Sequence, residues 1–327
     1  VSLTRRAVDG QPPRPERVDD VAIGFPEPDA FASSRDDITV RARFLDGVDL
    51  EEHLQIPFSD LNFYNADLSK HAKPKLTGPA GYLVDRAAFD NSLMVGATQA
   101  GAEFLARCHV EGIQPAGDVV RFVLDGGKTF AASLRLPGAG RNTNLLSHVG
   151  FVRRQGDHPI WTAQVTASAK EAASDSKPNV TVIFGLDGAS SFGLCMVSAG
   201  RVLVNVNWRG EAGNAVPHLV QLCRLAHEHN VIPVDLSKQA AKAKVLRSPA
   251  AAALDMESHV AKHTLLIGDA GGFLSAASNE GIYPAMWSAR LAAQVVDQAL
   301  DSRFSQDELM SFDSTWRMEM ADYLRSP

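Results

Sequence analysis

The chain has 327 residues, of which 45% are hydrophobic and 21% are charged, a composition typical of a soluble globular protein. Its 32 basic and 38 acidic residues give a net charge of −6, which provides no basic field for nucleic acid. No apolar stretch is long enough to span a bilayer as a helix, although the composition leaves room for peripheral membrane contact.

In chain order, residues 1–40 come first and show little regular pattern, so we expect an irregular segment there. A β-hairpin is predicted further along. Its strands are Val119 to Leu124 and Thr129 to Leu134, joined by an Asp125-Gly126-Gly127 turn.

The middle of the chain is rich in strands. Residues 160–167, 180–186 and 201–208 are predicted to share one largely antiparallel sheet, because β-branched residues alternate with polar ones. A helix is predicted from Ala215 to His229, with Asn214 as its N-cap. The apolar face of the sheet requires a cover.

Cys108, Cys195 and Cys223 are unevenly spaced and cannot all pair, which suits a reducing cytoplasm. None forms a Cys-x-x-Cys pair, so the sequence indicates neither a metal site nor a redox dithiol. Cys195 lies in an apolar run and is interpreted as a small buried hydrophobe rather than a nucleophile.

The most informative segment begins with a short buried strand, Thr264 to Ile267, which Gly268-Asp269 ends. A small-residue loop follows, and a helix opens near Ile282 with Pro284 in its first turn. Gly281 allows close approach of the backbone at the helix N-terminus, an end that attracts anions. A strand that delivers one carboxylate to such a helix start suits a ligand with hydroxyls and phosphate. The alternative is an ordinary strand–turn–helix with a capping Asp.

Residues 264–293 resemble the Gly-Asp motif of FAD-dependent oxidoreductases of the para-hydroxybenzoate-hydroxylase type. The segment is most similar to the geranylgeranyl-reductase-like branch, which reads Gly-Asp-Ala-Ala-Gly, a short loop, Gly-Glu-Gly-Ile and Ala-Met. The resemblance implies that Asp269 binds ribityl or ribose hydroxyls of FAD and that the helix start faces the flavin. The cofactor-binding residues it implies in this segment are Gly268, Asp269, Ala270, Glu280, Gly281 and Ile282.

Two further segments carry the resemblance. Residues 81–104 are similar to the family's Arg-x-x-Phe-Asp segment, which implies that Arg86 lies near the cofactor, where its fork suits a pyrophosphate. The alternative for Arg86 is a salt bridge to Asp85 or Asp90 at a solvated helix start. Residues 138–146 look like the family's Ala-Asp-Gly-x-x-Ser but lack its acidic residue.

The family's opening strand and Gly-x-Gly-x-x-Gly motif do not occur in this sequence. Either the chain is an N-terminally incomplete piece of a longer flavoprotein, or it is a shortened relative that handles the nucleotide differently. The first explanation is favoured, because the rest of the cofactor domain has little reason to keep its shape otherwise. We therefore expect this chain by itself to bind FAD weakly or not at all.

The resemblance predicts an α/β fold (α+β overall), with an FAD/NAD(P)-binding Rossmann-like domain that is incomplete at the N-terminus. Residues 41–150 and 260–327 form that domain, with 41–80 assignable to the substrate side, and 151–259 form an inserted antiparallel-sheet substrate domain.

The implied activity is FAD-dependent oxidoreduction of an apolar small molecule by hydride transfer through the flavin. The enzyme is either a reductase of double bonds or a monooxygenase that uses NAD(P)H, and no catalytic residue other than the flavin is assigned. A prenyl substrate is unsupported, because residues 191–199 lose most aromatics of the family's pattern. The alternative function is a degenerate, non-catalytic scaffold with the flavoprotein fold, or a fragment that does not bind FAD by itself.

Overall fold

The protein was analysed as a computed structural model, in which two compact units are distinguished. One comprises residues 1–22, 94–156 and 249–327, and the other comprises 23–93 and 157–248. The structure describes residues 31–33, 54–75, 81–84, 86–106, 108–117, 119–138, 140, 143–147, 150–151, 160–168, 177–186, 191–198, 201–248, 251–275 and 280–325. Most of the N-terminal segment predicted to be irregular lies outside these residues.

A seven-stranded sheet dominates the second unit, in the order β13-β9-β12-β11-β10-β3-β4. All neighbours pair antiparallel except β10 and β3, which are parallel. The predicted antiparallel sheet is therefore confirmed. The strands are β3 (Asp60–Asn65), β4 (His71–Ala72), β9 (Ile160–Ser168), β10 (Asn179–Phe184), β11 (Phe192–Ser198), β12 (Arg201–Arg209) and β13 (Val245–Arg247).

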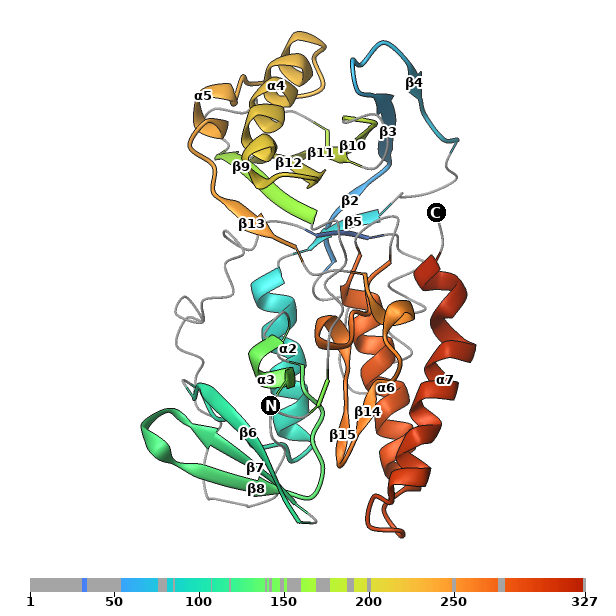
Figure 1. The fold of residues 1–327 in the computed structure, drawn as a ribbon. Coiled ribbons are helices and arrows are strands. Elements are labelled where there is room, and N and C mark those ends of the chain that lie inside the picture. Colours follow the sequence, from blue (N-terminus) through green and yellow to red (C-terminus); the bar gives the residue numbers. More distant parts are fainter. Residues whose placement is uncertain are drawn as a thin grey trace. The chain divides into compact units, whose positions relative to one another are not determined.

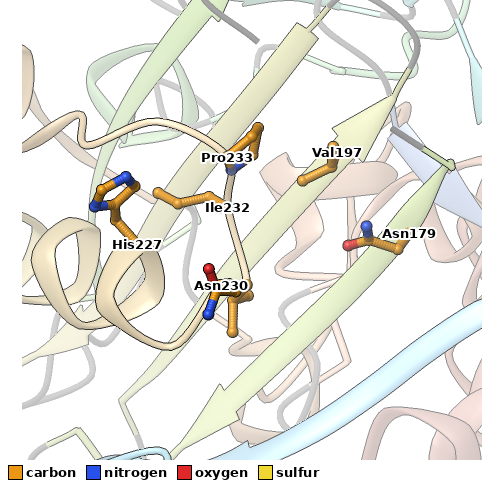
Figure 2. Close-up of a pocket in the computed structure, with 7 residues that line it drawn as sticks. Asn179, Val197, His227, Asn230, Ile232 and Pro233 are labelled. Atoms are coloured by element: carbon orange, nitrogen blue, oxygen red, sulfur yellow. The ribbon is translucent and has the colours of Figure 1, made fainter. Parts of the chain in front are cut away.

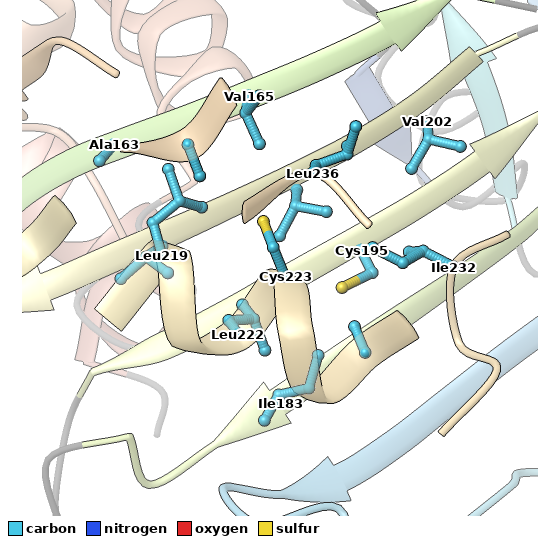
Figure 3. Packing of buried hydrophobic residues seen from close by; sticks show 14 of the residues in the cluster. Ala163, Val165, Ile183, Cys195, Val202, Leu219, Leu222, Cys223, Ile232 and Leu236 are labelled. Carbon is cyan, nitrogen blue, oxygen red and sulfur yellow. The ribbon is translucent and has the colours of Figure 1, made fainter. Parts of the chain in front are cut away.

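Helices α4 (Ala215–Glu228) and α5 (Ser237–Ala240) cover one face of this sheet (Figure 1). Figure 3 shows the core between them, in which alternate residues of the strands meet the apolar side of α4. Val204 and Leu219 are fully buried there. The sequence prediction that this apolar face requires a cover is thus confirmed.

Asn214 occupies the N-cap position of α4, as predicted, but its side chain does not cap the helix. Asn214 has right-handed helical dihedral angles and makes no side-chain cap hydrogen bond, because it ends a 3₁₀ turn, η3 (Ala212–Asn214), that leads directly into the helix. An N-cap residue needs an extended backbone to aim its side chain at the first helical N–H groups. The helix ends at Glu228, one residue before the predicted end.

Cys195 on β11 and Cys223 on α4 face each other's elements in the core between the sheet and this helix, as Figure 3 shows, and both are fully buried. Burial raises the pKa of Cys195 above its usual range and the pKa of Cys223 to about 12, so neither is a thiolate at neutral pH. The interpretation of Cys195 as a buried hydrophobe is confirmed.

Ellman's reagent should therefore distinguish the cysteines. We expect the exposed Cys108 to react within minutes in the native protein, while the other two react only after denaturation. A Cys108→Ser variant serves as control and should show almost no native reaction. Rapid native reaction of two or three thiols would contradict the buried core.

In the first unit, the predicted hairpin is confirmed and gains a third strand. The sheet has the order β6-β7-β8, with β6 (Val110–Ala116), β7 (Val119–Leu124) and β8 (Thr129–Ala132). The connection between β7 and β8 is a 3₁₀ turn, η2 (Asp125–Gly127), and β8 ends two residues before the predicted Leu134. The chain then reaches Arg135, which forms a parallel bridge with Thr264.

The predicted strand, loop and helix are also present. They are β15 (Thr264–Leu265), which pairs with β14 (Val260–Ala261), then η5 (Gly268–Gly271) and α6 (Ile282–Gln298). The strand is two residues shorter than predicted, although the Leu266 N–H still donates to the carbonyl of His259 (2.9 Å), one pair further along the same register.

A long C-terminal helix, α7 (Gln306–Arg325), packs beside α6 (Figure 1) and was not predicted. Its buried residues recur at helical spacing and form one hydrophobic cluster with residues of α6. They are Leu309, Phe312, Trp316, Met320 and Leu324.

The remaining elements are short, apart from helix α2. A three-stranded sheet has the order β1-β5-β2. Among the described residues, no helix combines the length and apolar character needed to cross a membrane. The elements are β1 (Phe31–Ser33), β2 (Leu54–Phe58), β5 (Gly81–Val84), α2 (Arg86–Gln99), α3 (Thr143–Ser147) and η4 (Ala253–Asp255).

Candidate functional site

Asp269 lies in the 3₁₀ turn η5, just beyond strand β15, as the sequence predicts. Backbone hydrogen bonds close this turn: the N–H of Gly272 donates to Asp269 O (3.1 Å), and that of Phe273 donates to Gly268 O (3.1 Å). Gly268 and Gly272 both have positive φ, of 54° and 71°, which favours glycine at each position. The glycines therefore shape the turn that presents Asp269.

The turn is fixed to helix α6 by a buried serine that the sequence analysis missed. Ser288 Oγ accepts a hydrogen bond from the Gly268 N–H (3.0 Å) and donates one to Ala285 O (3.0 Å). A Cβ on Gly268 would lie 3.3 Å from the Ala285 Cβ, so small residues are needed on both sides. The sequence does contain a signal for Ser288, because it is a polar residue on the apolar face of the predicted helix.

The carboxylate of Asp269 lies at the N-terminus of α6. A Cβ added to Gly281, the N-cap residue, would lie 3.4 Å from Asp269 Oδ1. Glycine at 281 therefore gives the carboxylate room to approach the helix start, where the helix dipole stabilises negative charge. Asp269 itself is half-buried, and so are Gly281 and Ile282.

Glu280 is already engaged within the protein. Its Oε1 accepts a hydrogen bond from the Tyr283 N–H (2.9 Å), and its Oε2 accepts one from the hydroxyl of Tyr323 on α7. The first bond satisfies an N–H in the opening turn of α6, which has no partner within the helix. Glu280 therefore holds the helix start in place, and its contact with the cofactor stays a proposal.

Two further residues were predicted to bind the cofactor, Ala270 and Arg86, and the structure describes the side chain of only the first. Ala270 is fully buried in a hydrophobic cluster with Leu266 and Met256, so its methyl group packs in the core. Arg86 begins helix α2, but its side chain lies outside the described part of the chain, and neither interpretation of it is tested.

A buried polar cluster around His259 packs against the turn η5 and binds one of its carbonyl groups. His259 Nε2 lies 2.8 Å from the carbonyl oxygen of Gly271, and the His259 ring contacts those of Phe273 and Trp316. Asp313 on α7 accepts hydrogen bonds from the His259 N–H (2.8 Å) and from Ser258 Oγ (2.5 Å). The sequence analysis gave no signal for this cluster.

Asp313 has a strongly lowered pKa. Burial alone raises the pKa of this carboxyl, but hydrogen bonds from His259, Ser258 and Trp316 outweigh it and bring the value to about 2. The ionised form is thus the one that the fold stabilises. Because the pKa in the unfolded chain is near 3.8, the stabilisation is present above about pH 4 and is lost as the pH falls toward about pH 2.

We expect the wild-type protein to lose about 2 kcal/mol of unfolding free energy relative to Asp313→Asn between about pH 4 and pH 2. Asparagine is neutral throughout and has no such dependence at this position. Urea unfolding of both proteins across this range measures the difference. A constant difference between them would contradict the lowered pKa.

A pocket of about 290 Å³ lies in the other unit, between the end of α4 and the strands β10 and β11. Figure 2 shows His227, Asn230 and Ile232 on the helix side, with Val197 and Asn179 on the strands. It contains none of the residues predicted to bind the cofactor. Among the described residues, no cluster of His, Cys, Asp and Glu is suited to a metal ion.

Comparison with known proteins gives a curated sequence relative and similar solved structures. No protein-family model matches the chain. The digeranylgeranylglycerophospholipid reductase of Methanocaldococcus jannaschii is 23% identical over 254 residues, which cover 75% of this chain. The chain spans 63% of the length of that curated relative.

Two solved structures illustrate the likeness in fold. A geranylgeranyl bacteriochlorophyll reductase-like protein from Thermoplasma acidophilum matches with a TM-score of 0.69 and 14% identity, over 91% of this chain and 74% of that one. CtdE in complex with FAD and a substrate matches with a TM-score of 0.61 and 12% identity, over 93% and 78% of the two chains. The fold is that of FAD-binding flavoproteins, and the resemblance to geranylgeranyl-reductase-like proteins is confirmed.

Proposed function

We propose that this chain is an FAD-dependent oxidoreductase that acts on a small molecule with an apolar part. The observation that carries the proposal is the position of the Asp269 carboxylate at the N-terminus of α6, beside Gly281. In this proposal the unit that contains α6 binds the cofactor and the seven-stranded sheet binds the substrate. A cytoplasmic location, inferred from three free cysteines, belongs to the same proposal.

The residues around α6 fit part of FAD. A carboxylate accepts hydrogen bonds from hydroxyls, which suits the ribityl or ribose portion, and Gly281 supplies space that a Cβ would fill. Bound FAD supplies the hydride-transfer chemistry. The protein binds and orients the cofactor, and the positive end of α6 stabilises negative charge beside it.

A titration of the purified chain with FAD tests the proposal. We expect saturable quenching of flavin fluorescence at high FAD concentration, with riboflavin, which lacks the nucleotide, binding more weakly. Adding NADH or NADPH without oxygen should then bleach the visible absorbance of the flavin. Absence of saturable binding would overturn the proposal for this chain, in favour of a non-catalytic scaffold or a fragment that does not bind FAD by itself.

Oxygen consumption separates the two activities that the family resemblance leaves open. A monooxygenase couples the oxidation of NAD(P)H to oxygen uptake that substrate stimulates. A reductase of double bonds transfers hydride equivalents to its substrate without that uptake. An oxygen electrode therefore assigns the reaction class once a substrate is known.

A further inference from the structure

We next consider the face of the seven-stranded sheet that points away from α4. In its central rows, polar side chains lie on β9 and β12, and apolar side chains lie on β11 and β10. Asn205 on β12 lies in the middle of it, since its neighbours along the strand point into the core beneath α4. Gln164 on β9 pairs with Asn205 on one side, and Leu194 on β11 pairs with it on the other. The same row continues through Val182 to Phe63.

The next row repeats this division. Thr162 pairs with Asn207, which in turn pairs with Phe192 and then Phe184. The ring of Phe184 is stacked with that of Phe63 at 6.0 Å between centroids, and Phe184 is 52% exposed. In these two rows, hydroxyls and amides thus occupy β9 and β12, while aliphatic and aromatic side chains occupy β11 and β10. On β3 the first row ends at Phe63 and the second at Asn65.

The polar side chains form a hydrogen-bonded chain with a fixed direction. Thr162 Oγ1 donates to Asn207 Oδ1 (3.1 Å), and Asn207 Nδ2 donates to Asn205 Oδ1 (2.8 Å). Because the single hydroxyl hydrogen of Thr162 is used, Ser248 Oγ must donate to Thr162 Oγ1 (2.6 Å). Every donor therefore points toward Asn205.

Asn205 ends this chain with an amide NH₂ that has no partner among the described residues. The residue is only 8% exposed. A nearly buried donor without an acceptor is unfavourable, and an acceptor oxygen of a ligand would satisfy it.

We propose that Asn205 determines substrate specificity by donating to an acceptor oxygen, carbonyl or phosphoryl, of an amphiphilic ligand. The apolar part of that ligand lies along Leu194, Val182 and Phe63. The proposal deepens the proposed function by naming the substrate class, and it rests on that function only for its link to redox chemistry. Binding at Asn205 is measurable without FAD, so the two can fail separately.

Calorimetric titration of the whole chain tests the proposal with three ligands that share a decyl chain or its acyl equivalent. Methyl decanoate offers a carbonyl, decyl phosphate offers a phosphoryl group, and decylammonium offers only donors. Each is used below its critical micelle concentration. We expect at least one acceptor ligand to bind about tenfold more tightly than decylammonium, and the tighter of the two identifies the acceptor.

Substitutions at Asn205 assign the effect to its amide. Asn205→Asp keeps the oxygen that accepts from Asn207 but replaces the donor, and Asn205→Leu removes both. Each should weaken binding of the acceptor ligand about tenfold. Thr166→Val, on the same face of β9 and outside the hydrogen-bonded chain, should leave binding unchanged.

Circular dichroism and urea unfolding check that each variant is folded. Equal affinity for all three decyl ligands would overturn the proposal. Unchanged affinity of folded Asn205→Leu for the acceptor ligand would do the same. If the wild-type protein binds decylammonium more tightly than either acceptor ligand, the face prefers hydrogen-bond donors. That result would also overturn the proposal.

Discussion

Gly272→Ala is expected to destabilise the protein by about 3 kcal/mol. Gly272 has a φ of 71°, which strains any residue with a Cβ. The added Cβ would also lie 2.8 Å from the backbone N of Ala253 and 2.9 Å from the carbonyl carbon of Ala252. Backbone atoms cannot turn aside as a flexible side chain can. The N–H groups of Ala252 and Ala253 also donate hydrogen bonds to Gly272 O, both at 3.1 Å, which keeps this backbone close to Gly272.

A matched control separates the collision from the backbone strain. Gly126 has almost the same φ, 70°, but a Cβ there would meet nothing within 4 Å. Gly126→Ala should therefore cost only about 1 kcal/mol, from strain alone. Urea unfolding of both variants measures the difference. Equal destabilisation would show that residues 252–253 move aside, contrary to the close packing described.

Local patterns predict the parts of this fold that depend on neighbours in sequence. The strand at Thr264–Leu265 and the helix from Ile282 follow from an aliphatic run at 265–267, a glycine-rich turn and helical periodicity. The helix from Gln306 carries an equally local signal, because its buried residues recur every three or four positions. This helix lies outside the segments that carry the family resemblance, although its pattern is readable from the sequence alone.

Long-range contacts carry no such signal. Strand β3 pairs in parallel with β10, more than 100 residues away, and nothing near Asp60 indicates that partner. Asp313 accepts from His259, which is 54 positions earlier in the sequence. The order of side chains across strands, which places Gln164, Asn205 and Leu194 in one row, likewise depends on register between distant segments. The Gly-Asp turn was predictable, whereas the contacts that hold it were not.

The contacts that hold the turn around Asp269 matter, because a single carboxylate binds a ligand well only if its position is fixed. The turn is held from one side by Ser288 and from the other by His259, which meets Gly271 O. Both contacts engage backbone atoms of the turn and not the Asp269 side chain. A loss of FAD binding in an Asp269 variant would therefore report on the carboxylate, provided that the turn keeps its stability.

Asp269→Ala is accordingly expected to weaken FAD binding about ten- to a hundredfold. A hydrogen bond to a charged acceptor contributes about 1.5–3 kcal/mol, and every 1.4 kcal/mol changes the dissociation constant about tenfold. Asp269→Asn should lose less, because the amide oxygen still accepts a hydrogen bond beside Gly281. Flavin fluorescence titration of the folded variants, carried to high FAD concentration, measures the three affinities.

Asp255→Asn provides the control for net charge, because Asp255 is an exposed carboxylate in η4 of the same unit. It removes one negative charge without touching the turn, so the FAD affinity should stay at the wild-type value. Urea unfolding of Asp269→Ala establishes that its turn and α6 remain folded. If that folded variant binds FAD as tightly as the wild-type protein, the cofactor does not use Asp269, and the assignment of this site is wrong. If binding falls and Asp255→Asn is unaffected, the carboxylate at the start of α6 is the contact that the cofactor requires.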